Sequence, residues 1–462
     1  MINAYNLFHD FVGLLYKWVW AFPLLLLIVG VGVYLTVALR GLQFRYLFYG
    51  LRLTVSKKYA GEGEISHYES LMTALAATVG ISNIAGVSTA LTVGGFGAIF
   101  WMWVTALLGM AIKYSEAFLA ITYREEDARG ETVGGPMFYI SKGLGWKTLA
   151  LSFAIFGAIS SFGGGNMLQA NSIADALRDL MGFPSIYTGI LLAVITGMTL
   201  IGGIKSIGRA AGLLVPFMAI FYLSGAFVIL WHHLHHIPGV FGRIFADAFT
   251  GQAAVGGFAG ATLVVLLQTG VSRGLMTSES GLGTGSIAAA AAKTDYPGRQ
   301  AMVSMTGSFL ATIVMCTVSA LVIGVTGVFG TQTDSGSLVT GVSLTILAFN
   351  TVIPWGSAVV TGAVVFFGFT TLLGWAYYGE KCVEYFLGAG SVPYFRAVFS
   401  LVIIPGAVLD LKIVWMIADA FNGLMAIPNL IGVIFLSPLV VRETKEFLKL
   451  VAQEQRDEAA QK

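Results

Sequence analysis

The groups that could bind a small ligand are concentrated in three glycine-containing stretches inside long apolar segments. The first stretch, residues 74–86, holds Thr78, Gly80, Ser82 and Asn83. A helix that unwinds here would offer carbonyl oxygens from one half and free N–H groups from the next, which suits a cation or a zwitterion. The alternative is a stripe of small residues that lets neighbouring helices pack closely.

Two further stretches have the same character. The second, residues 247–261, has its glycines around Phe258, with sequence typical of helices on both sides. The third, residues 160–172, places Asn166 and Gln169 after consecutive glycines. Amide side chains are costly to expose to lipid, so they either line a cavity or join helices through hydrogen bonds.

Ionised side chains are almost absent from these stretches, and only Asp247 lies at an edge of one. A charge at the centre of a bilayer costs roughly 2.5–3.5 kcal/mol, so a bound ion would be held by carbonyl and hydroxyl oxygens instead. Such ligation suits a hard alkali cation such as Na⁺. The spans contain no Cys and His cluster with the spacing of metal ligands and no nucleophile beside a base, so the sequence does not indicate an enzyme.

Lys113 and Glu116 are two charged residues within a different apolar segment. They are three residues apart on one predicted helix, so we expect them to neutralise each other. The alternative is a role in gating.

The composition is that of an integral membrane protein. Of the 462 residues, 56% are hydrophobic and only 11% are charged. In soluble domains, about a quarter of all residues are charged. The net charge of +2 gives no indication of nucleic-acid binding. The first basic residue is Lys17, and the apolar run after it is long enough to span a bilayer, so we expect a retained helix and not a cleaved signal peptide.

Apolar segments of about 20 residues cross a bilayer as helices. Such segments follow one another here with short polar joins, which predicts an all-α polytopic membrane protein with about 11 transmembrane helices. The predicted spans are 18–39, 67–92, 95–122, 147–180, 184–204, 209–231, 240–274, 299–327, 357–387, 394–411 and 412–440.

The loops predict the orientation of these spans, because Lys and Arg accumulate on the cytoplasmic side. With the N-terminus outside, 21 of the 26 basic residues fall on the side of the C-terminus and four on the other side. The larger group includes Arg273, which is the last residue but one of the seventh predicted span and is counted with the loop after it. We therefore expect a cytoplasmic C-terminus.

The positions of the first two stretches indicate an inverted repeat. The second span opens a run of five spans, and the seventh opens another. Interrupted segments at matching positions of two halves are typical of transporters built from inverted repeats. The predicted organisation is an extra N-terminal transmembrane helix with a cytoplasmic linker (1–66), a first five-helix repeat (67–231), a second, inverted repeat (240–440) and a cytoplasmic tail (441–462).

A run rich in Gly and Trp carries a family resemblance. Residues 94–109 read Gly-Gly-Phe-Gly-Ala-Ile-Phe-Trp-Met-Trp-Val-Thr-Ala-Leu-Leu-Gly. This run resembles the signature of the sodium:alanine (alanine or glycine:cation) symporter family, as do residues 110–117, 274–283 and 368–375. The resemblance extends from about residue 60 to 440. It implies a LeuT-type fold of the amino acid-polyamine-cation superfamily, with a 5+5 inverted repeat preceded by one extra helix.

The resemblance also implies a function. The family's members are secondary active symporters, so we expect import of alanine or glycine, coupled to the Na⁺ gradient by alternating access in a prokaryotic plasma (inner) membrane. Na⁺ is then the coupling ion, and we expect a monomer in the lipid bilayer. The alternatives are a Na⁺-independent or proton-coupled amino-acid carrier of the same fold and, from other classes, a channel or a membrane-embedded enzyme.

Sodium-binding residues follow from the same resemblance. The residues expected to hold one sodium ion are Ala76, Val79 and Phe367 through carbonyl oxygens and Thr370 and Thr371 through hydroxyls. A second sodium ion is expected at Thr78 and Asn83.

Substrate-binding residues are implied in the same way. The carboxylate is expected to face N–H groups around residues 80–83, and the ammonium to face carbonyls near residues 254–256. The expected substrate-binding residues are Thr78, Val79, Gly80, Ser82, Asn83, Gly165, Asn166, Gln169, Ala254, Gly256, Phe258, Thr371 and Trp375. Phe258 and Trp375 would close the side-chain end of a small pocket. Residues 277–280 read Thr-Ser-Glu-Ser where the family pattern has Ser-Asn-Glu-Ala, a departure expected to bear on gating more than on substrate choice.

Overall fold

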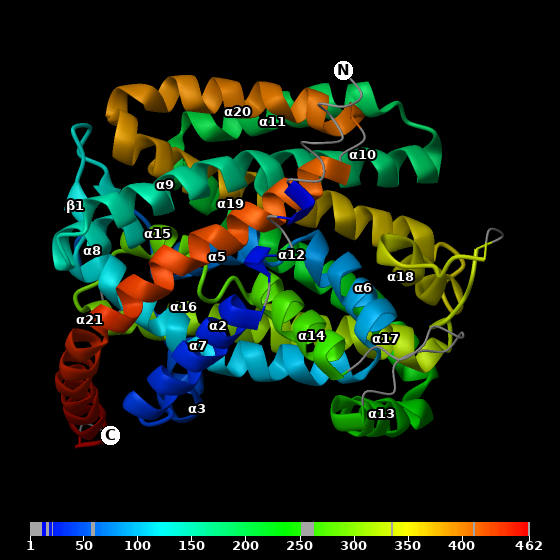
Figure 1. Cartoon of the computed structure of the whole chain (residues 1–462), viewed down its shortest axis with the longest axis horizontal. Coiled ribbons are helices and arrows are strands. Elements are labelled where there is room, and N and C mark those ends of the chain that lie inside the picture. Colours follow the sequence, from blue (N-terminus) through cyan, green and yellow to red (C-terminus); the bar gives the residue numbers. More distant parts are fainter. Residues whose placement is uncertain are drawn as a thin grey trace.

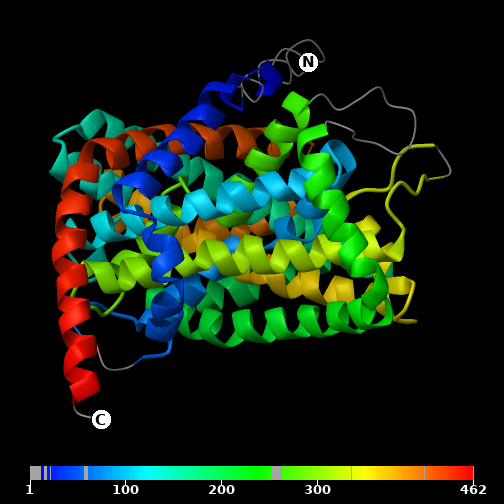
Figure 2. The same cartoon turned by 90° about the horizontal axis from the view of Figure 1, so that it is seen from below.

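Helices make up nearly all of the chain. The computed structural model describes residues 12–14, 18–20, 22–56, 61–250, 263–333, 336–409 and 412–460. Most of its helices run lengthwise through the molecule (Figure 1, Figure 2). A small hairpin is the exception, in which β1 (Glu125–Glu126) pairs antiparallel with β2 (Thr132–Val133).

The helices follow the apolar segments of the sequence. In the first half they are α2 (Phe22–Ala38), α3 (Leu42–Arg45), α4 (Leu47–Thr54), α5 (His67–Thr78), α6 (Ala85–Gly94), α7 (Gly97–Thr122), α8 (Pro136–Gly143), α9 (Lys147–Phe162), α10 (Leu168–Met181), α11 (Ser185–Ile201) and α12 (Gly203–His232). In the second half they are α13 (Ile237–Thr250), α14 (Leu263–Ser278), α15 (Thr284–Ala290), α16 (Pro297–Ser308), α17 (Thr317–Thr326), α18 (Gly341–Asn350), α19 (Gly356–Leu387), α20 (Val392–Val408) and α21 (Lys412–Ala460). Short 3-10 or π turns join some of them, namely η1 (Ile81–Asn83), η2 (Gly163–Met167), η3 (Leu234–His236), η4 (Phe309–Cys316) and η5 (Ala389–Ser391).

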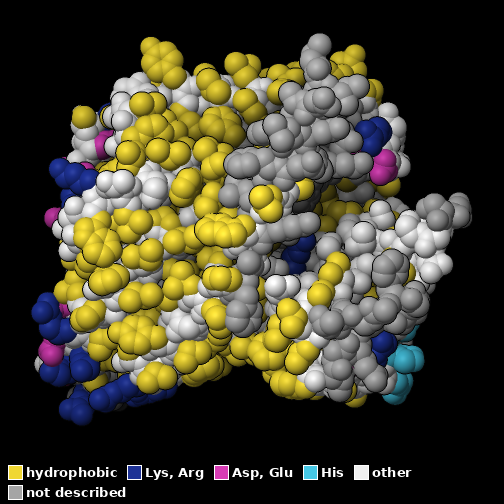
Figure 3. Space-filling model, in the orientation of Figure 1, with side chains coloured by type: hydrophobic (Ala, Val, Ile, Leu, Met, Phe, Trp, Pro, Cys, Tyr) yellow, Lys and Arg dark blue, Asp and Glu magenta, His cyan; other side chains and the backbone are white. Residues whose placement is uncertain are grey.

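The surface is apolar in the middle and charged at the ends. Figure 3 shows a broad hydrophobic face, with most Lys, Arg, Asp and Glu side chains at the edge where α21 ends. Large apolar side chains are exposed along the outer helices, for example Leu213, Ile220 and Phe227 on α12. Their spacing of seven residues places them on one side of that helix. A surface of this kind belongs in the hydrocarbon of a bilayer.

Seven helical segments among the described residues are long and apolar enough to cross a membrane, by length and composition. They are Gly97–Thr122, Lys147–Met181, Gly203–His232, Pro297–Thr326, Gly356–Leu387, Ala389–Val408 and Met416–Asp457. Four shorter apolar helices accompany them, Pro23–Ala38, Ala85–Gly94, Ser185–Ile201 and Gly341–Asn350. The predicted all-α polytopic fold is confirmed, whereas the count of eleven spans is not established, because interrupted helices fall below the length of a full span.

The predicted seventh span, residues 240–274, stays a prediction in its middle part. The described residues on either side of that part belong to α13, up to Thr250, and to α14, from Leu263, and residues 251–262 lie outside the described residues. Both helices pack against α7. Arg273 therefore lies inside α14 and not in a loop, which removes it from the basic residues that predict the orientation.

The end of the chain also differs from the prediction. The sequence predicts a span over residues 412–440 and a separate tail, but α21 is continuous from Lys412 to Ala460 and contains Pro428 and Pro438. Both views show its last part turned across the end of the molecule where α8 and β1 lie in Figure 1.

Two interrupted helices meet in the interior. The first consists of α5 and α6, and the second of α14 and α15. Contacts join α5 to α15 and α6 to α14, so the first half of each packs against the second half of the other. The two therefore run antiparallel, as the halves of an inverted repeat require.

Candidate functional site

The first interrupted helix has well-defined ends. It starts with a capping box, in which the Glu69 N–H donates to Ser66 Oγ (3.2 Å) and the Ser66 N–H donates to the Glu69 carboxylate (2.9 Å). It ends at Thr78, the backbone of Gly80 is extended, and η1 leads into α6. The interruption predicted within residues 74–86 is therefore confirmed. The break frees the last carbonyl groups of α5 and the first N–H groups after it from helix hydrogen bonding.

Oxygen atoms from α5 and α19 meet at this break. Thr371 Oγ1 lies 3.1 Å from Ala76 O and 2.8 Å from Phe367 O. Thr370 Oγ1 lies 3.1 Å from the same Phe367 oxygen. Val79 caps α5 with a non-helical backbone, at ψ 81°. Two carbonyls and two hydroxyls at such distances can turn their lone pairs toward a hard cation.

Gly80 packs directly against these oxygen atoms. A Cβ atom at this position would lie 2.6 Å from Thr371 Oγ1, so a larger residue would displace that hydroxyl. The Gly80 N–H donates to Asn83 Oδ1 (3.1 Å), and Asn83 Nδ2 donates to Ala311 O (2.8 Å). Asn83 thus connects the break to residue Ala311, and both the oxygen and the nitrogen of its amide group bind protein partners.

Thr78, the other expected ligand of a second sodium ion, faces a different group. Its hydroxyl donates to Ala74 O (2.7 Å) and lies 3.3 Å from Glu279 Oε2. Across the described part of the chain, no hydrogen bond joins Thr78 to Asn83. The hydrogen bonds of Thr78 and Asn83 go to different partners, and the second sodium site at these two residues stays a prediction.

The second interruption lies at residues 279–283, between α14 and α15. Three of its residues have positive φ angles, 50° at Glu279, 91° at Gly281 and 80° at Gly283. The sequence placed this interruption at residues 247–261, of which residues 247–250 end helix α13. The predicted substrate residues of that stretch, Ala254, Gly256 and Phe258, lie outside the residues that the structure describes.

The second break frees a carbonyl group at the end of α14. The Ser280 N–H donates to Ser278 Oγ (3.3 Å) instead of to the carbonyl of Met276, which a continuing α-helix would require. Met276 lines the same cavity as Gly80. Residues at both helix breaks therefore line one cavity.

The third stretch forms a π turn, η2, between α9 and α10. Gln169 lines the cavity, and its Nε2 donates to Gly164 O (2.9 Å). Asn166 is fully buried and donates to Phe399 O on α20 (2.7 Å), so it joins helices. Gly165 packs against Trp375, where a Cβ atom would lie 2.3 Å from the Trp375 Cβ.

A cavity of about 290 Å³ opens between these elements. It is lined by Ala77, Gly80, Ile81, Ser82, Ala85, Gly86, Thr89, Gly164, Leu168, Gln169, Ser172, Arg273, Met276, Glu279, Leu282, Thr371, Trp375, Asp419 and Asn422. Of the expected substrate residues, it includes Gly80, Ser82, Gln169, Thr371 and Trp375. The lining residues do not include Thr78, Val79, Asn83, Gly165 or Asn166.

Charged side chains in the cavity were not predicted. Arg273 comes from α14, Glu279 from the second break and Asp419 from α21. All three lie outside the glycine-rich stretches of the sequence. A charged residue within an apolar helix was the available signal, and Asp419 and Arg273 both provide it.

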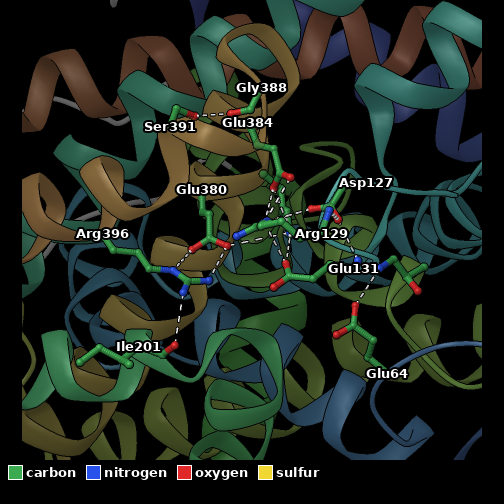
Figure 4. A network of polar contacts seen from close by, with 12 residues as sticks. Glu64, Asp127, Arg129, Glu131, Ile201, Glu380, Glu384, Gly388, Ser391 and Arg396 are labelled. Carbon is green, nitrogen blue, oxygen red and sulfur yellow. Dashed lines mark hydrogen bonds and ion pairs between the residues drawn. The ribbon is translucent and has the colours of Figure 1, made fainter.

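A network of ion pairs ties the β hairpin to α19 and α20 (Figure 4). Arg129 lies 3.2 Å from Glu384, and Lys381 lies 2.7 Å from Glu131. Arg396 binds Glu380 through two contacts, of 2.6 and 2.9 Å. The network lies at the end of the molecule where most of the visible charged side chains gather (Figure 3).

The sequence matches a known family along its whole length. The pattern of the family described as "Sodium:alanine symporter family" matches residues 5–461. The chain is 50% identical to the sodium/alanine symporter AgcS of Methanococcus maripaludis, over 95% of this chain and 97% of that protein. It is 32% identical to the amino-acid carrier protein AlsT of Bacillus subtilis, over 96% of this chain and 93% of that protein.

Solved structures of low sequence identity share the fold. The structure of MhsT in complex with L-phenylalanine matches with a TM-score of 0.55 at 14% identity, over 82% of this chain and 98% of that chain. A manganese transporter from Eremococcus coleocola matches with a TM-score of 0.51 at 15% identity, over 80% and 79%. The fold is that of the LeuT-type transporters, as expected from the resemblance.

Proposed function

Since the chain belongs to the sodium:alanine symporter family, we propose that this transport protein imports alanine or glycine together with Na⁺ by alternating access. The observation that carries the proposal is the group of oxygen atoms from Ala76, Phe367, Thr370 and Thr371 at the first helix break. A relative that shares half of its residues with the chain, AgcS, is named a sodium/alanine symporter.

The proposed sodium ion replaces hydrogen bonds that exist without it. The hydroxyls of Thr370 and Thr371 rotate their protons away, and their lone pairs join the carbonyls of Ala76, Val79 and Phe367 around the ion. The end of α5 contributes the negative end of its dipole, which favours a cation at this place. Because the ligands come from α5 and α19, binding of the ion fixes these helices relative to each other.

The proposed substrate lies between the two breaks. Its carboxylate faces the N–H groups of Ile81 and Ser82, which stand at the start of a helical segment where no preceding turn accepts from them. Its ammonium faces the freed carbonyl of Met276 at the end of α14. Trp375 and Gln169 line the same cavity and limit the length of the substrate side chain.

The proposed location is a prokaryotic inner membrane, with the N-terminus outside and the C-terminus in the cytoplasm. The asymmetry of basic residues supports this orientation even without Arg273. We further propose that one chain is the transporting unit, because one chain contains both breaks and a cavity that residues of both breaks line.

Uptake of labelled alanine into proteoliposomes tests the proposal. An inward Na⁺ gradient should drive accumulation, and choline in place of Na⁺ should abolish it. A proton gradient without Na⁺ should drive none, which separates the symporter from a proton-coupled carrier of the same fold. Unlabelled glycine should compete. Uptake that is indifferent to the exchange of Na⁺ for choline would overturn the proposal.

A further inference from the structure

The cavity lies mainly between one half of each interrupted helix. Its lining includes residues of α6 and α14, among them Thr89 and Met276, and among the described residues it includes none of α15 and none of α5 before Ala77. The other two halves, α5 and α15, pack against each other. Every residue of α15 is buried. The cavity is therefore bounded on that side by the packed pair of α5 and α15.

The segments next to these two helices also lie side by side. Residues 61–65 lead into α5, and residues 291–294 follow α15. The Lys293 N–H donates to the Ile65 carbonyl (2.7 Å), and further backbone hydrogen bonds and two β-bridges join the segments. We call this contact between residues 61–65 and 291–294 the α5–α15 junction. It connects the first residue turns before one helix to those after the other.

Two glycines let the segments approach each other closely. A Cβ atom would lie 2.3 Å from the Thr294 carbonyl oxygen at Gly61 and 2.4 Å from the Ala292 carbonyl oxygen at Gly63. Both contacts are to backbone atoms, which cannot turn aside as a side chain can. A larger residue at either position would therefore push the two segments apart, so the α5–α15 junction depends on glycine.

Arg124 joins both segments from the end of α7. Its Nη1 donates to Ala290 O (3.3 Å) and Ala292 O (3.0 Å), and its Nη2 donates to Glu62 O (3.0 Å). The guanidinium group is planar and carries five N–H donors, so it can serve acceptors of two segments at once. Its positive charge strengthens each of these hydrogen bonds. Arg124 therefore ties the start of α5 to the end of α15.

The β hairpin holds the segment before α5 from another side. The Thr132 N–H of β2 donates to Glu64 Oε1 (2.7 Å), and Figure 4 shows Glu64 next to the ion pairs of the hairpin. Lys381 on α19 binds Glu131, the neighbour of Thr132, at 2.7 Å. The segment before α5 is thus connected to α19 as well as to α15.

We propose that Arg124 is a positioning residue for transport, which keeps the α5–α15 junction together and so keeps the cavity closed on that side. The inference rests on the proposed function, because a carrier opens its site to the two sides of the membrane in turn. In the proposed orientation this side is cytoplasmic. For the cavity to open between α5 and α15, Arg124 must release the carbonyls of one segment. The hydrogen bonds of the junction lie outside the helices, so they can break and re-form while both helices stay intact.

The accessibility of Ser70 tests this role without transport. Ser70 is 1% exposed, and its hydroxyl donates to Ala288 O on α15 (3.0 Å), so it lies in the interface between α5 and α15. With both native cysteines replaced by alanine, the reaction of Ser70→Cys with a water-soluble maleimide is followed on the purified protein in detergent. Arg124→Ala should increase the rate at least about tenfold, because three charge-assisted hydrogen bonds are lost.

Matched variants control this experiment. Arg209→Ala removes an exposed arginine of α12 and should leave the rate unchanged. Gly61→Ala separates the segments without touching Arg124 and should increase the rate, whereas Gly390→Ala should not, since a Cβ atom there meets nothing within 4 Å. An unchanged rate in Arg124→Ala or Gly61→Ala, with a folded protein by gel filtration, would overturn the inference. The reaction needs neither alanine nor Na⁺, so this result is distinct from a failure of the symporter.

A disulfide across the junction tests the same role in transport. Glu62 and Thr294 are antiparallel bridge partners, and such partners are close enough for a disulfide. In the Glu62→Cys/Thr294→Cys protein, oxidation should abolish alanine uptake into proteoliposomes but not alanine binding, and a reductant should restore uptake. Normal uptake by protein shown by mass spectrometry to be cross-linked would overturn the inference, and so would a pair that does not cross-link. Absence of Na⁺-driven uptake in the native protein would instead overturn the symporter.

Discussion

Thr371 has a special position among the site residues because one hydroxyl group links two helices. Its Oγ1 touches a carbonyl of α5 and a carbonyl of its own helix, α19, and it lies where the Gly80 backbone passes. A threonine places this oxygen with a rigid χ1 angle, since the β-branched side chain has few rotamers. The site therefore depends on a close approach between Gly80 and Thr371 as much as on the oxygen itself.

Gly80→Ala tests this close approach. The added Cβ atom would stand 2.6 Å from Thr371 Oγ1 and push the hydroxyl away from the sodium site. We expect the Na⁺ concentration for half-maximal uptake to rise by at least about tenfold, which corresponds to about 1.4 kcal/mol of lost binding. Gly30→Ala in α2 is the matched control, because no atom lies within 4 Å of a Cβ there. Equal effects of the two substitutions would contradict the account.

Several site residues can be predicted from the sequence, and others cannot. The residues around Thr371 and Gly80 are recognisable because polar groups and glycine interrupt an apolar segment. Asn83 looks like a ligand for the same reason, but its amide is used to brace the chain. Arg273 and Asp419 are recognisable as charged residues within apolar helices, but the sequence does not show which side of a long helix faces the cavity.

At the scale of elements, the second break depends on more than glycine content. The stretch 247–261 lies mostly outside the described residues, and the interruption within them is at 279–283. There the left-handed backbone includes Glu279, a residue type that rarely adopts it. Contacts of its carboxylate with Thr78 and Thr284 compensate for this conformation, and such long-range contacts are invisible in local sequence.

The hairpin network makes a prediction about stability. Arg396 forms two contacts with Glu380, which is only 1% exposed. Arg396→Ala leaves this carboxylate without its main partner in a buried place, which should cost about 3 kcal/mol. Thermal unfolding in detergent, followed by circular dichroism, should show a clear decrease in Tm.

Lys449→Ala is the control for this prediction. Lys449 pairs with Glu446 on the surface of α21, where both side chains are well exposed, so the loss should be at most about 0.5 kcal/mol. If Arg396→Ala were as stable as this control, the Arg396–Glu380 pair would not stabilise the packing of α20 against α19.

At the scale of the whole molecule, composition alone predicts the class of fold. A chain with 56% hydrophobic residues must place its polar backbone in helices if it is to stay in a bilayer, and the structure is built in this way. The number of spans is harder to predict, because broken helices divide a span and continuous ones, such as α21, run past the membrane. The two interrupted helices, α5 with α6 and α14 with α15, are also the elements that indicate the inverted repeat.

Binding of labelled alanine to the purified protein as a function of Na⁺ concentration tests the sodium site at the first helix break. We expect Na⁺ to increase alanine binding to the native protein and to Thr361→Ala, a buried threonine of α19 outside the site, but not to Thr371→Ala. Equal dependence on Na⁺ in Thr371→Ala and the native protein would contradict a sodium site at the break between α5 and α6.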